Sequence, residues 1–355
     1  MGLKLLHSAD WHLDTPFTQF LPEQRQYLRE ALGKIPQQVV SLAQREGCDA
    51  ILLAGDLFDG PAATETVAHL KRVLESARMP VFITPGNHDF CCPGSVWVEE
   101  SWPDNVFIFT GGLSYVDVPE LQLRVYGAGY QSMDCKGLLE GFRIQEGPRY
   151  QVAVIHGDAI TKGSPYCPIT AAQVKHSGLM YLALGHIHKA GAFHSGDTLA
   201  AWPGCPMGRG WDETGDKGVC LVTLEDTAQV RAISIPAPRF FDFSVDTAGE
   251  PLHALEAVLP PGESQDFYRV TLTGDGPVDC ADLLRAFPLL PNLDLVDRTQ
   301  VPLDPWENAG EDTLEGVYFR LLRQLGQENP DQAETVQLAA SISRKLLSGR
   351  EVTLP

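Results

Sequence analysis

The sequence lacks any apolar run that could cross a membrane. A spanning helix needs roughly 18 or more consecutive apolar residues, and polar or charged residues interrupt the apolar runs of this chain well before that length. The first six residues are also too short to form the core of a signal peptide before His7. We therefore expect a soluble, cytoplasmic protein that does not bind membranes.

The sequence also lacks the cysteine spacing of a metal ribbon or a redox motif. Its 8 cysteines include no Cys-x-x-Cys pair, and Cys91-Cys92 is the only local cluster. Disulfide frameworks are typical of much smaller secreted chains. We expect reduced thiols without a chemical role, and a redox or metal-binding role is the alternative.

Positive charge is in deficit. The net charge is −19, from 27 Lys and Arg against 46 Asp and Glu. Proteins that bind nucleic acid unaided usually carry basic patches, so this balance argues against a free-standing nucleic-acid binder. The excess of acidic over basic residues is greatest in the last third of the chain. Residues 241–355 hold 8 basic and 20 acidic residues, whereas residues 1–240 hold 19 basic and 26 acidic residues. The first part of the chain therefore repels phosphate less strongly than the total net charge suggests.

What the sequence does contain is a regular alternation of short apolar runs and amphipathic segments. The apolar runs Leu3–His7, Ala50–Ala54 and Val81–Thr84 predict buried strands, and hydrophobic residues at spacings of three and four predict helices over Pro22–Glu46 and Ala62–Ala77. This rhythm implies parallel strands joined by right-handed crossovers.

After this region the pattern becomes mostly strands. Further strands are predicted at Val106–Phe109, Ser114–Val118, Gln122–Tyr126, Gln151–Ile155 and Leu179–Leu184, followed by a meander of hairpins at Ala190–His194, Leu199–Trp202, Gly218–Leu224 and Gln229–Ile235. The predicted fold class is α/β (α+β), with a two-sheet sandwich flanked by helices.

Three domains are predicted. Residues 1–238 form the sandwich, and Pro236-Ala237-Pro238 is the linker that ends it. Residues 239–305 would form a small α/β capping domain with strands at Phe240–Val245 and Phe267–Thr273 and a helix at Asp279–Phe287. Residues 306–355 would form a helical hairpin over Asp312–Ser348, in which Asp312 and Glu315 make a capping box and Asn329-Pro330 starts the second helix.

Five short polar motifs follow predicted strands. They are Asp10-x-His12, Gly55-Asp56-x-x-Asp59, Gly86-Asn87-His88-Asp89, His156-Gly157-Asp158 and Gly185-His186-x-His188. Because strand ends converge on one rim of a layered α/β protein, these side chains can meet there. Any one motif could be a surface turn, but all five in this order indicate a single site.

The donor types indicate metal ions. Carboxylate, amide and imidazole ligands without thiolate suit Mn²⁺, Fe²⁺ or Zn²⁺. Seven ligands are too many for one ion and suit two ions roughly 3.5–4 Å apart that share a carboxylate. The predicted ligands are Asp10, His12, Asp56, Asn87, His156, His186 and His188. Such an ion pair lowers the pKa of a bridging water and clamps phosphate oxygens.

Together these motifs resemble those of the calcineurin-like metallophosphoesterase superfamily, over about the first 220 residues. Within it the sequence is most similar to the SbcD-like DNA-repair exonuclease branch, on His7–Leu13, Ala54–Asp59, Trp202–Pro206 and Lys217–Val219. Some nucleases of this kind carry histidine where this chain has Asp59, and their usual Pro-Gly-Ser-Pro turn has Cys205 in place of serine here.

The resemblance implies a role for each ligand. One ion would be held by Asp10, His12 and His188, the other by Asn87, His156 and His186, and Asp56 would bridge them. Mn²⁺ is the first candidate and Fe²⁺ or Zn²⁺ the alternatives. His88 would be catalytic rather than a ligand, protonating the leaving oxygen or stabilising the transition state, with catalytic Asp89 orienting its ring. Asp59 would support a ligand from behind.

Two aromatic features allow more than one interpretation. Trp11 and Phe58 are expected to pack beneath the site, with base stacking as the alternative. Arg209 and Trp211 are expected to form a cation–aromatic pair, with phosphate contact by Arg209 as the alternative.

Three functions remain open. The resemblance favours a two-metal-dependent phosphodiesterase that acts as a DNA exonuclease or endonuclease in DNA repair, with an SMC-like coiled-coil ATPase as partner and homodimers as in related nucleases. The leucine stripe of the terminal hairpin suits helix-in-groove binding of that ATPase, or it packs on its own chain. The acidic balance favours a phosphoesterase for small phosphodiesters or nucleotides. The third alternative is a non-catalytic subunit that binds DNA or the ATPase.

Overall fold

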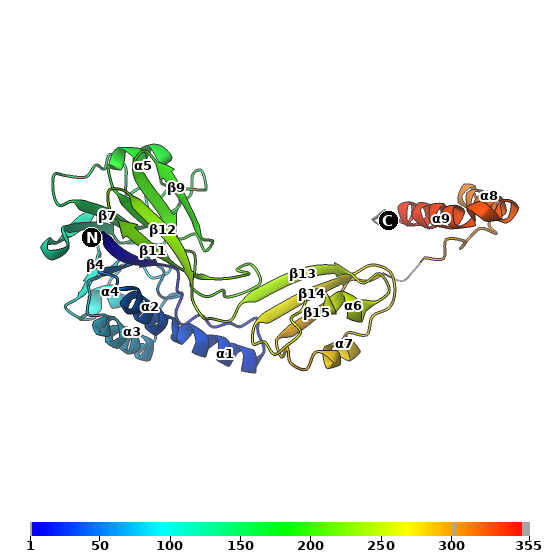
Figure 1. Cartoon of the computed structure of the whole chain (residues 1–355), viewed down its shortest axis with the longest axis horizontal. Coiled ribbons are helices and arrows are strands. Elements are labelled where there is room, and N and C mark those ends of the chain that lie inside the picture. Colours follow the sequence, from blue (N-terminus) through cyan, green and yellow to red (C-terminus); the bar gives the residue numbers. More distant parts are fainter. Residues whose placement is uncertain (1, 301–302, 350–355) are drawn as a thin grey trace. The chain divides into compact units, whose positions relative to one another are not determined.

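A computed structural model describes residues 2–300 and 303–349 of the chain (Figure 1). They form two compact units. The first contains the described residues up to Asp242 together with Gln265–Arg269, and the second contains Phe243–Ser264 and the described residues from Val270 onward. Each unit has its own core.

The first unit contains two six-stranded sheets, and the first of them has the order β12-β11-β1-β2-β3-β4. The strands β1 to β4 are parallel, and β11 pairs antiparallel with β1 and β12. Their bounds are β1 Leu3–Ser8, β2 Ala50–Leu53, β3 Val81–Ile83, β4 Val106–Ile108, β11 Gly218–Leu224 and β12 Ala228–Ser234. The central strands are buried on both faces, which explains their continuous apolar sequence.

The second sheet has the order β5-β6-β7-β8-β10-β9. Its inner strands β6, β7, β8 and β10 are parallel, and the two edge strands run antiparallel to their neighbours. The bounds are β5 Ser114–Val118, β6 Leu123–Ala128, β7 Tyr150–His156, β8 Tyr181–Gly185, β9 Gly191–Ser195 and β10 Thr198–Trp202. The predicted two-sheet fold class is confirmed.

The predicted meander of the last four strands is wrong. Strands β9 and β10 form a hairpin in the second sheet, whereas β11 and β12 form a hairpin in the first. The chain leaves the second sheet at Pro203-Gly204-Cys205-Pro206, where two prolines cannot donate ladder hydrogen bonds. It then pairs with β1, where Leu5 lies opposite Val222.

Helices cover the outer faces of the two sheets (Figure 1). Helix α2 contacts β1 and α3 on one side, and α5 contacts β9 and β10 on the other. The single helix predicted over Pro22–Glu46 is two helices that meet at Lys34, where Gly33 ends the first helix and Pro36 lies in the first turn of the second. The bounds are α1 Pro22–Gly33, α2 Ile35–Glu46, α3 Thr64–Ser76, α4 Val96–Glu99, η1 Pro119–Leu121 and α5 Ala171–Ser177.

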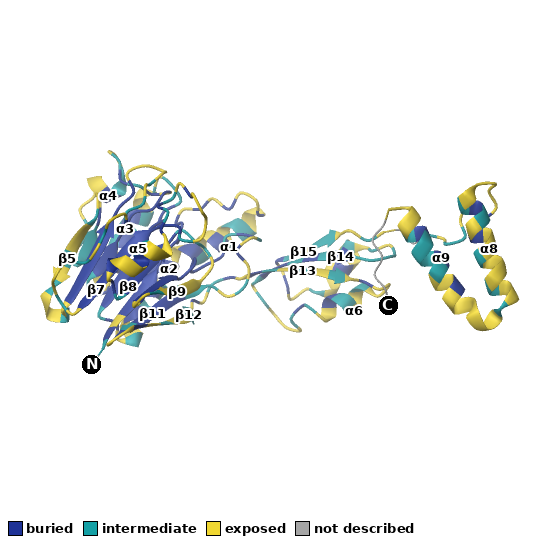
Figure 2. Cartoon of the chain, turned by 90° about the horizontal axis from the view of Figure 1, so that it is seen from above, coloured by how far each residue is buried: buried dark blue, intermediate teal, exposed yellow. Residues whose placement is uncertain are grey.

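Three apolar layers hold the first unit together, and Figure 2 shows its strands as mostly buried. Leu5 and Val154 belong to the layer between the sheets, Leu6 and Val39 to the layer beneath α1–α3, and Leu182 to the layer beneath α5. Adjacent residues of one strand thus serve different layers, because successive side chains point to opposite faces.

The second unit contains most of a three-stranded sheet of order β13-β14-β15. Its elements are β13 Phe240–Asp246, α6 Pro251–Glu256, β14 Phe267–Thr273, α7 Cys280–Ala286 and β15 Leu293–Asp297. Strands β13 and β14 and helix α7 were predicted, and α6 and β15 were not. The N-cap of α7 is Asp279, whose carboxylate accepts from the N–H groups of Ala281 and Asp282.

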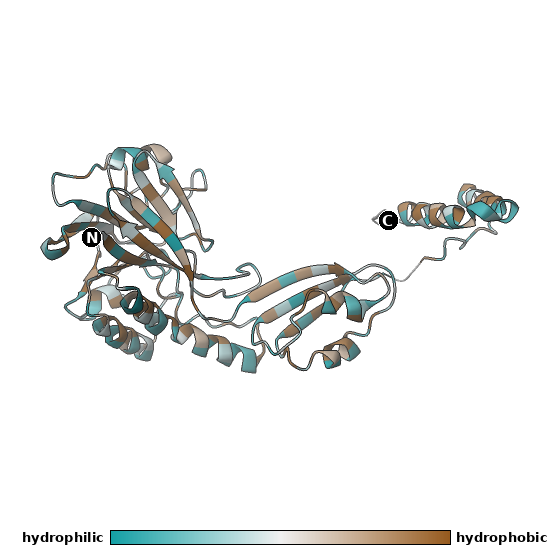
Figure 3. Cartoon of the chain, in the orientation of Figure 1, coloured by the Kyte–Doolittle hydropathy of each residue, from teal (hydrophilic) through white to brown (hydrophobic). Residues whose placement is uncertain are grey.

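The predicted helical hairpin is present as α8 Leu314–Glu328 and α9 Ala333–Leu347, joined by η2 Pro330–Gln332. The cap of α8 is Thr313 and not Asp312, because the Thr313 hydroxyl accepts from the N–H of Gly316 at 3.0 Å. Figure 3 shows hydrophobic residues along both helices, and Figure 2 shows much of their surface exposed. Across the described ranges, no helix combines the length and the apolar character that crossing a bilayer requires.

Candidate metal centre

The seven predicted ligands meet at one end of the two sheets. Each follows or ends a parallel strand: β1, β2 and β3 in the first sheet, and β7 and β8 in the second. The side chains of Asp10, His12 and His156 are fully buried, and Asp56 and Asn87 nearly so. The predicted convergence of five loops on one rim is therefore what the structure shows.

Backbone hydrogen bonds join the first two loops. The N–H of Asp10 donates to the carbonyl of Gly55, and the N–H of His12 donates to that of Asp56, both at 3.0 Å. Asp10, His12, Asp56 and His186 all have positive φ, between 48° and 88°. Such torsions cost non-glycine residues roughly 1–3 kcal/mol and persist where surrounding contacts enforce them, often at functional sites.

The two sheets lie close to each other beside His156. Its Nδ1 lies 2.9 Å from the carbonyl oxygen of Ala54, at the end of the first sheet. A Cβ on Gly185, which pairs with His156 in the second sheet, would lie 1.8 Å from the same oxygen. Only a residue without a side chain fits there, so Gly185 allows the two halves of the site to meet.

One group of donors consists of Asp10, His12 and His188. Each offers one atom that lies within 4.8 Å of the others. The Nε2 atoms of the two imidazoles are 3.2 Å apart, and Nε2 of His188 is 4.0 Å from Oδ1 of Asp10.

A second group forms around Asn87. Its Oδ1 lies 2.9 Å from Nε2 of His156 and 3.2 Å from Nδ1 of His186. Oδ2 of Asp56 is 3.3 Å from Nε2 of His156 and 3.8 Å from Nε2 of His12. Asp56 therefore faces both groups, as a bridging ligand would.

Two carboxylates lie behind the imidazoles of the first group. Nδ1 of His12 is 3.1 Å from Asp59, and Nδ1 of His188 is 2.5 Å from the buried Glu213. Each Nδ1–H then donates to a carboxylate, which leaves a lone pair on each Nε2. Two lone pairs that face each other at 3.2 Å repel unless a cation lies between them. The donor set thus fits a divalent ion.

Glu213 was missed as part of the site, and its partner Arg209 was considered only as a partner of Trp211 or a contact for phosphate. Arg209 donates to Glu213 at 3.0 Å, and its Nη1 is 3.7 Å from Asp59. The signal in the sequence was weak, since Glu213 is one acid among 46 and lies in a glycine-rich loop after residue 207. Only the spatial contact with His188 singles it out.

A family comparison agrees with this geometry. Residues 3–190, about half of the chain, match the family described as calcineurin-like phosphoesterase. The chain belongs to the calcineurin-like phosphoesterase family. The match includes all seven predicted ligands, together with His88 and Asp89.

Curated relatives of this phosphoesterase include three bacterial and archaeal proteins. An uncharacterized metallophosphoesterase, YhaO of Bacillus subtilis, is 34% identical over 62% of this chain and 57% of its own length. The SbcD component of the SbcCD nuclease of the same organism is 24% identical over 62% and 66%. The DNA double-strand break repair protein Mre11 of Aeropyrum pernix is 24% identical over 77% and 64%. The phosphoesterase thus spans less than two thirds of each of these relatives.

Solved structures with a similar fold include a dimetal phosphatase from Danio rerio. It is 12% identical to the phosphoesterase, with a TM-score of 0.45 over 65% of this chain and 96% of that chain.

The pKa values of the buried ligands of the phosphoesterase show how their charges balance when no metal ion is bound. Burial raises the pKa of Asp10 to about 6, against the effect of His156 and His188. Burial also opposes charge on Asp56, but His156 and His12 hold its pKa well below the usual range. Although burial opposes protonation of His156, Asp56 raises its pKa to about 9. Without an ion, a proton on His156 therefore balances Asp56, and a bound cation would replace that proton.

The orientation predicted for His88 is wrong in one respect. Asp89 was expected to orient the ring, but its oxygens accept from the N–H groups of Gly86, Leu57 and Phe58. The carboxylate that faces the ring is Asp59, 3.3 Å from Nδ1 of His88. Asp89 instead fixes the loops, because Gly86 and Leu57 flank the ligand-bearing turns. The hydrogen bond to Asp59 raises the pKa of His88.

The other expectations had mixed outcomes. Trp11 and Phe58 are buried and pack in the core, as expected. The predicted pairing of Arg209 with Trp211 is wrong, since Arg269 lies over the Trp211 ring at 4.3 Å while Arg209 pairs with Glu213. Cys205 is buried beside Glu213, and all eight cysteines are free thiols.

Proposed function

We propose that this protein is a two-metal-dependent phosphodiesterase that cleaves DNA. The observation that carries the proposal is the convergence of imidazole, carboxylate and amide donors from five loops into two adjacent groups. One ion would be held by Asp10, His12 and His188 and the other by Asn87, His156 and His186, with Asp56 between them. These ions, with Mn²⁺ as first candidate, would supply an activated water and neutralise phosphate charge.

His88 serves as the general acid in this proposal. Its side chain is 46% exposed, its ring lies 4.7 Å from that of His12, and its Nδ1 faces Asp59. A proton on Nδ1 is held by Asp59, so Nε2–H is free to donate to the leaving oxygen of a phosphodiester. Asp59 acts through His88 and His12 as a positioning residue, and Arg209 anchors Asp59 in turn.

The choice of DNA as substrate is supported by the relatives and opposed by the charge. Two relatives are a nuclease component and a double-strand break repair protein, and each is only 24% identical. The net charge of −19 favours the second candidate, a phosphoesterase for small phosphodiesters or nucleotides. A basic partner surface would compensate for this charge in the first candidate.

The hairpin of α8 and α9 is the proposed binding site for an SMC-like coiled-coil ATPase. Several of its leucines are exposed: Leu314, Leu321, Leu325, Leu338, Leu346 and Leu347. Leu314, Tyr318, Leu346 and Leu347 line a groove of about 610 Å³, which suits the apolar stripe of a partner helix. The division into a nuclease domain (1–238), a capping domain (239–305) and an ATPase-binding segment (306–355) belongs to this proposal, and 350–355 lie outside the described residues.

One assay separates the candidates. The purified full chain is incubated with Mn²⁺ and either end-labelled linear DNA or bis-p-nitrophenyl phosphate. Shortening of the DNA supports the nuclease, and turnover of the small ester alone supports the second candidate. Silence on both substrates, in protein that binds two ions per chain, supports the non-catalytic subunit and refutes the proposed function.

Replacement of His88 tests its assigned role. We expect His88→Ala to keep both ions and lose about 10²–10⁴-fold in kcat, the usual contribution of a general acid. His176→Ala, at an exposed position of α5, is the matched control and should keep full activity. Elemental analysis decides the alternative: an H88A protein that lacks one ion would make His88 a ligand and not an acid.

Introducing negative charge into the groove of the α8–α9 hairpin tests the proposed ATPase-binding site. We expect Leu346→Glu together with Leu347→Glu to abolish co-purification with the SMC-like ATPase of the same genome while ester hydrolysis persists. Leu289→Glu, a comparably exposed leucine outside the hairpin, is the control. Undiminished co-purification of the double variant would contradict the assignment.

A further inference from the structure

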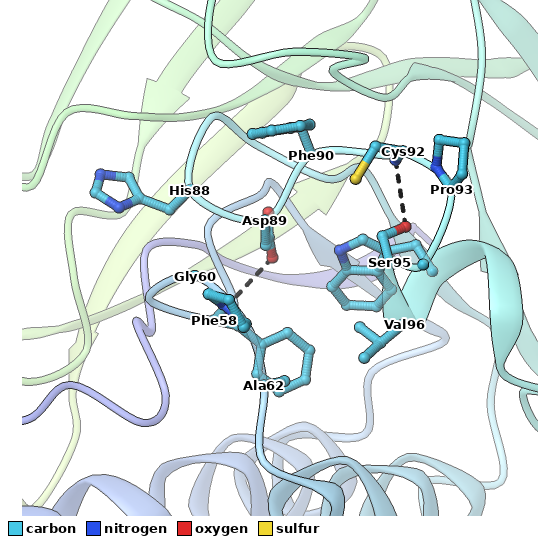
Figure 4. Close-up of a pocket in the computed structure, with 13 residues that line it drawn as sticks. Phe58, Gly60, Ala62, His88, Asp89, Phe90, Cys92, Pro93, Ser95 and Val96 are labelled. Atoms are coloured by element: carbon cyan, nitrogen blue, oxygen red, sulfur yellow. Dashed lines mark hydrogen bonds between the residues drawn. The ribbon is translucent and has the colours of Figure 1, made fainter.

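A pocket of about 320 Å³ lies beside the metal centre and has no assigned role. It is lined mainly by the loop that follows Asn87 and by the turn after Phe58 (Figure 4). Pockets for small ligands measure roughly 300–1,000 Å³, so this one is large enough for a single planar ring system. His88 lines the pocket and also packs against His12, so it lies between the pocket and the metal ligands.

The lining is apolar and aromatic. Phe58, Phe90, Val96 and Trp97 contribute to it, together with prolines and glycines. None of the lining residues is Lys or Arg, and the two charged or titratable side chains besides Cys92 are His88 and Asp89. Asp89 is already engaged by backbone N–H groups. The pocket therefore suits a neutral ring and not a phosphate.

One buried polar atom of a lining residue lacks a hydrogen-bond partner within the described part of the chain. The side chain of Trp97 is buried, and its Nε1–H has no hydrogen-bond partner among the described residues. Its ring is held in place by stacking on Trp102 at 5.1 Å and by Phe58 at 5.4 Å. A buried donor without a partner costs free energy, so a ligand that carries an acceptor would be favoured there.

We propose that this pocket binds the nucleobase next to the scissile phosphate, on the leaving-group side. The inference rests on the proposed function, in which His88 protonates the leaving oxygen. The nucleoside that carries this oxygen then lies on the same side of the metal centre as His88 and the pocket. The half-buried Phe90 and Val96 provide the contact area, backed by the buried rings of Phe58 and Trp97, and a ring nitrogen or carbonyl of the base accepts from Trp97 Nε1–H once the lining shifts to uncover that buried atom. Every natural base has such an acceptor, so the pocket favours a base over an apolar ring without selecting strongly among bases.

The test uses two dinucleotides that carry 2-aminopurine on one or the other side of the phosphate. Stacking quenches 2-aminopurine fluorescence, so binding is read without turnover, in metal-free full-length protein and in the first seconds after Mn²⁺ addition. We expect quenching for one dinucleotide and much less for the other. A dinucleotide that lacks the base on the quenched side should be cleaved with a kcat/KM about 5- to 150-fold lower than that of the intact dinucleotide, the range for one stacked base.

Variants locate the effect. Ala62→Phe would fill the pocket and abolish quenching, whereas Ala63→Phe, at the neighbouring exposed position, should leave it unchanged. Trp97→Phe keeps the ring but removes the donor and should weaken binding several-fold. Thermal unfolding and metal content show that each variant is folded.

Absence of quenching in the wild-type protein, or quenching that survives in A62F, would overturn the inference. Hydrolysis of bis-p-nitrophenyl phosphate by the same preparation tests the proposed function separately. Active protein without base binding would refute the base pocket and leave the proposed function standing, whereas base binding without hydrolysis would refute the proposed function and leave a base-binding pocket with no scissile phosphate beside it.

Discussion

Replacing Gly185 with alanine should destabilise the first unit where its two sheets meet. The new Cβ would lie 1.8 Å from the carbonyl oxygen of Ala54 and 2.8 Å from Nδ1 of His156. Backbone atoms cannot rotate away, so the sheets must separate or the strand must shift. Overpacking of this kind costs about 1–3 kcal/mol. For a unit of this size, 1 kcal/mol lowers Tm by about 2–4 °C, so we expect a decrease of about 2–12 °C.

Thermal unfolding of metal-free protein measures this effect directly. Gly191→Ala is the matched control, since a Cβ there would lie 4.0 Å from its nearest neighbour in the ring of Trp202. The G185A protein should also bind divalent ions more weakly, because the His156–Ala54 hydrogen bond fixes the ligand atom Nε2. A Tm within 1 °C of the wild type would refute the reasoning that the sheets need glycine at this junction.

Two further predictions concern buried polar groups in the two units. Burial lowers the pKa of His7 to about 3. Between that value and 6.5 only the unfolded chain binds the proton, so stability falls as the pH is lowered through this window. Compared with His7→Asn, the wild type should lose about 2 kcal/mol more of unfolding free energy between pH 7 and pH 5 in urea titrations. Equal losses would contradict the assignment. In the hairpin, buried Arg344 pairs with Glu315 and lies over the Phe319 ring at 4.2 Å. Arg344→Ala should cost about 1–3 kcal/mol and speed amide exchange in α8 and α9, whereas exposed Arg323→Ala should not. Unchanged exchange in R344A would show that the pair is dispensable.

The sequence alone was sufficient for features that depend on local order. Apolar runs with polar motifs directly after them located β1, β2, β3, β7 and β8, because a buried strand must be apolar throughout and its ligand-bearing loop must follow it. The same reasoning predicted that Asp10 and His188 would meet although 178 residues separate them in the chain. Periodicity likewise located α8 and α9, since an amphipathic stripe is written into consecutive turns.

Tertiary structure decided which groups support those ligands besides Asp59, which its place in the second motif had already indicated. Glu213 lies 25 residues from His188, and no local pattern distinguishes it from the other acids. Asp59 and Asp89 both belong to the five motifs, yet only Asp59 faces His88, because the loop turn directs Asp89 toward backbone N–H groups. Strand β11 joins the first sheet through its pairing with β1, far away in sequence. Such choices depend on packing between distant segments, where many partners are chemically equivalent and geometry selects one.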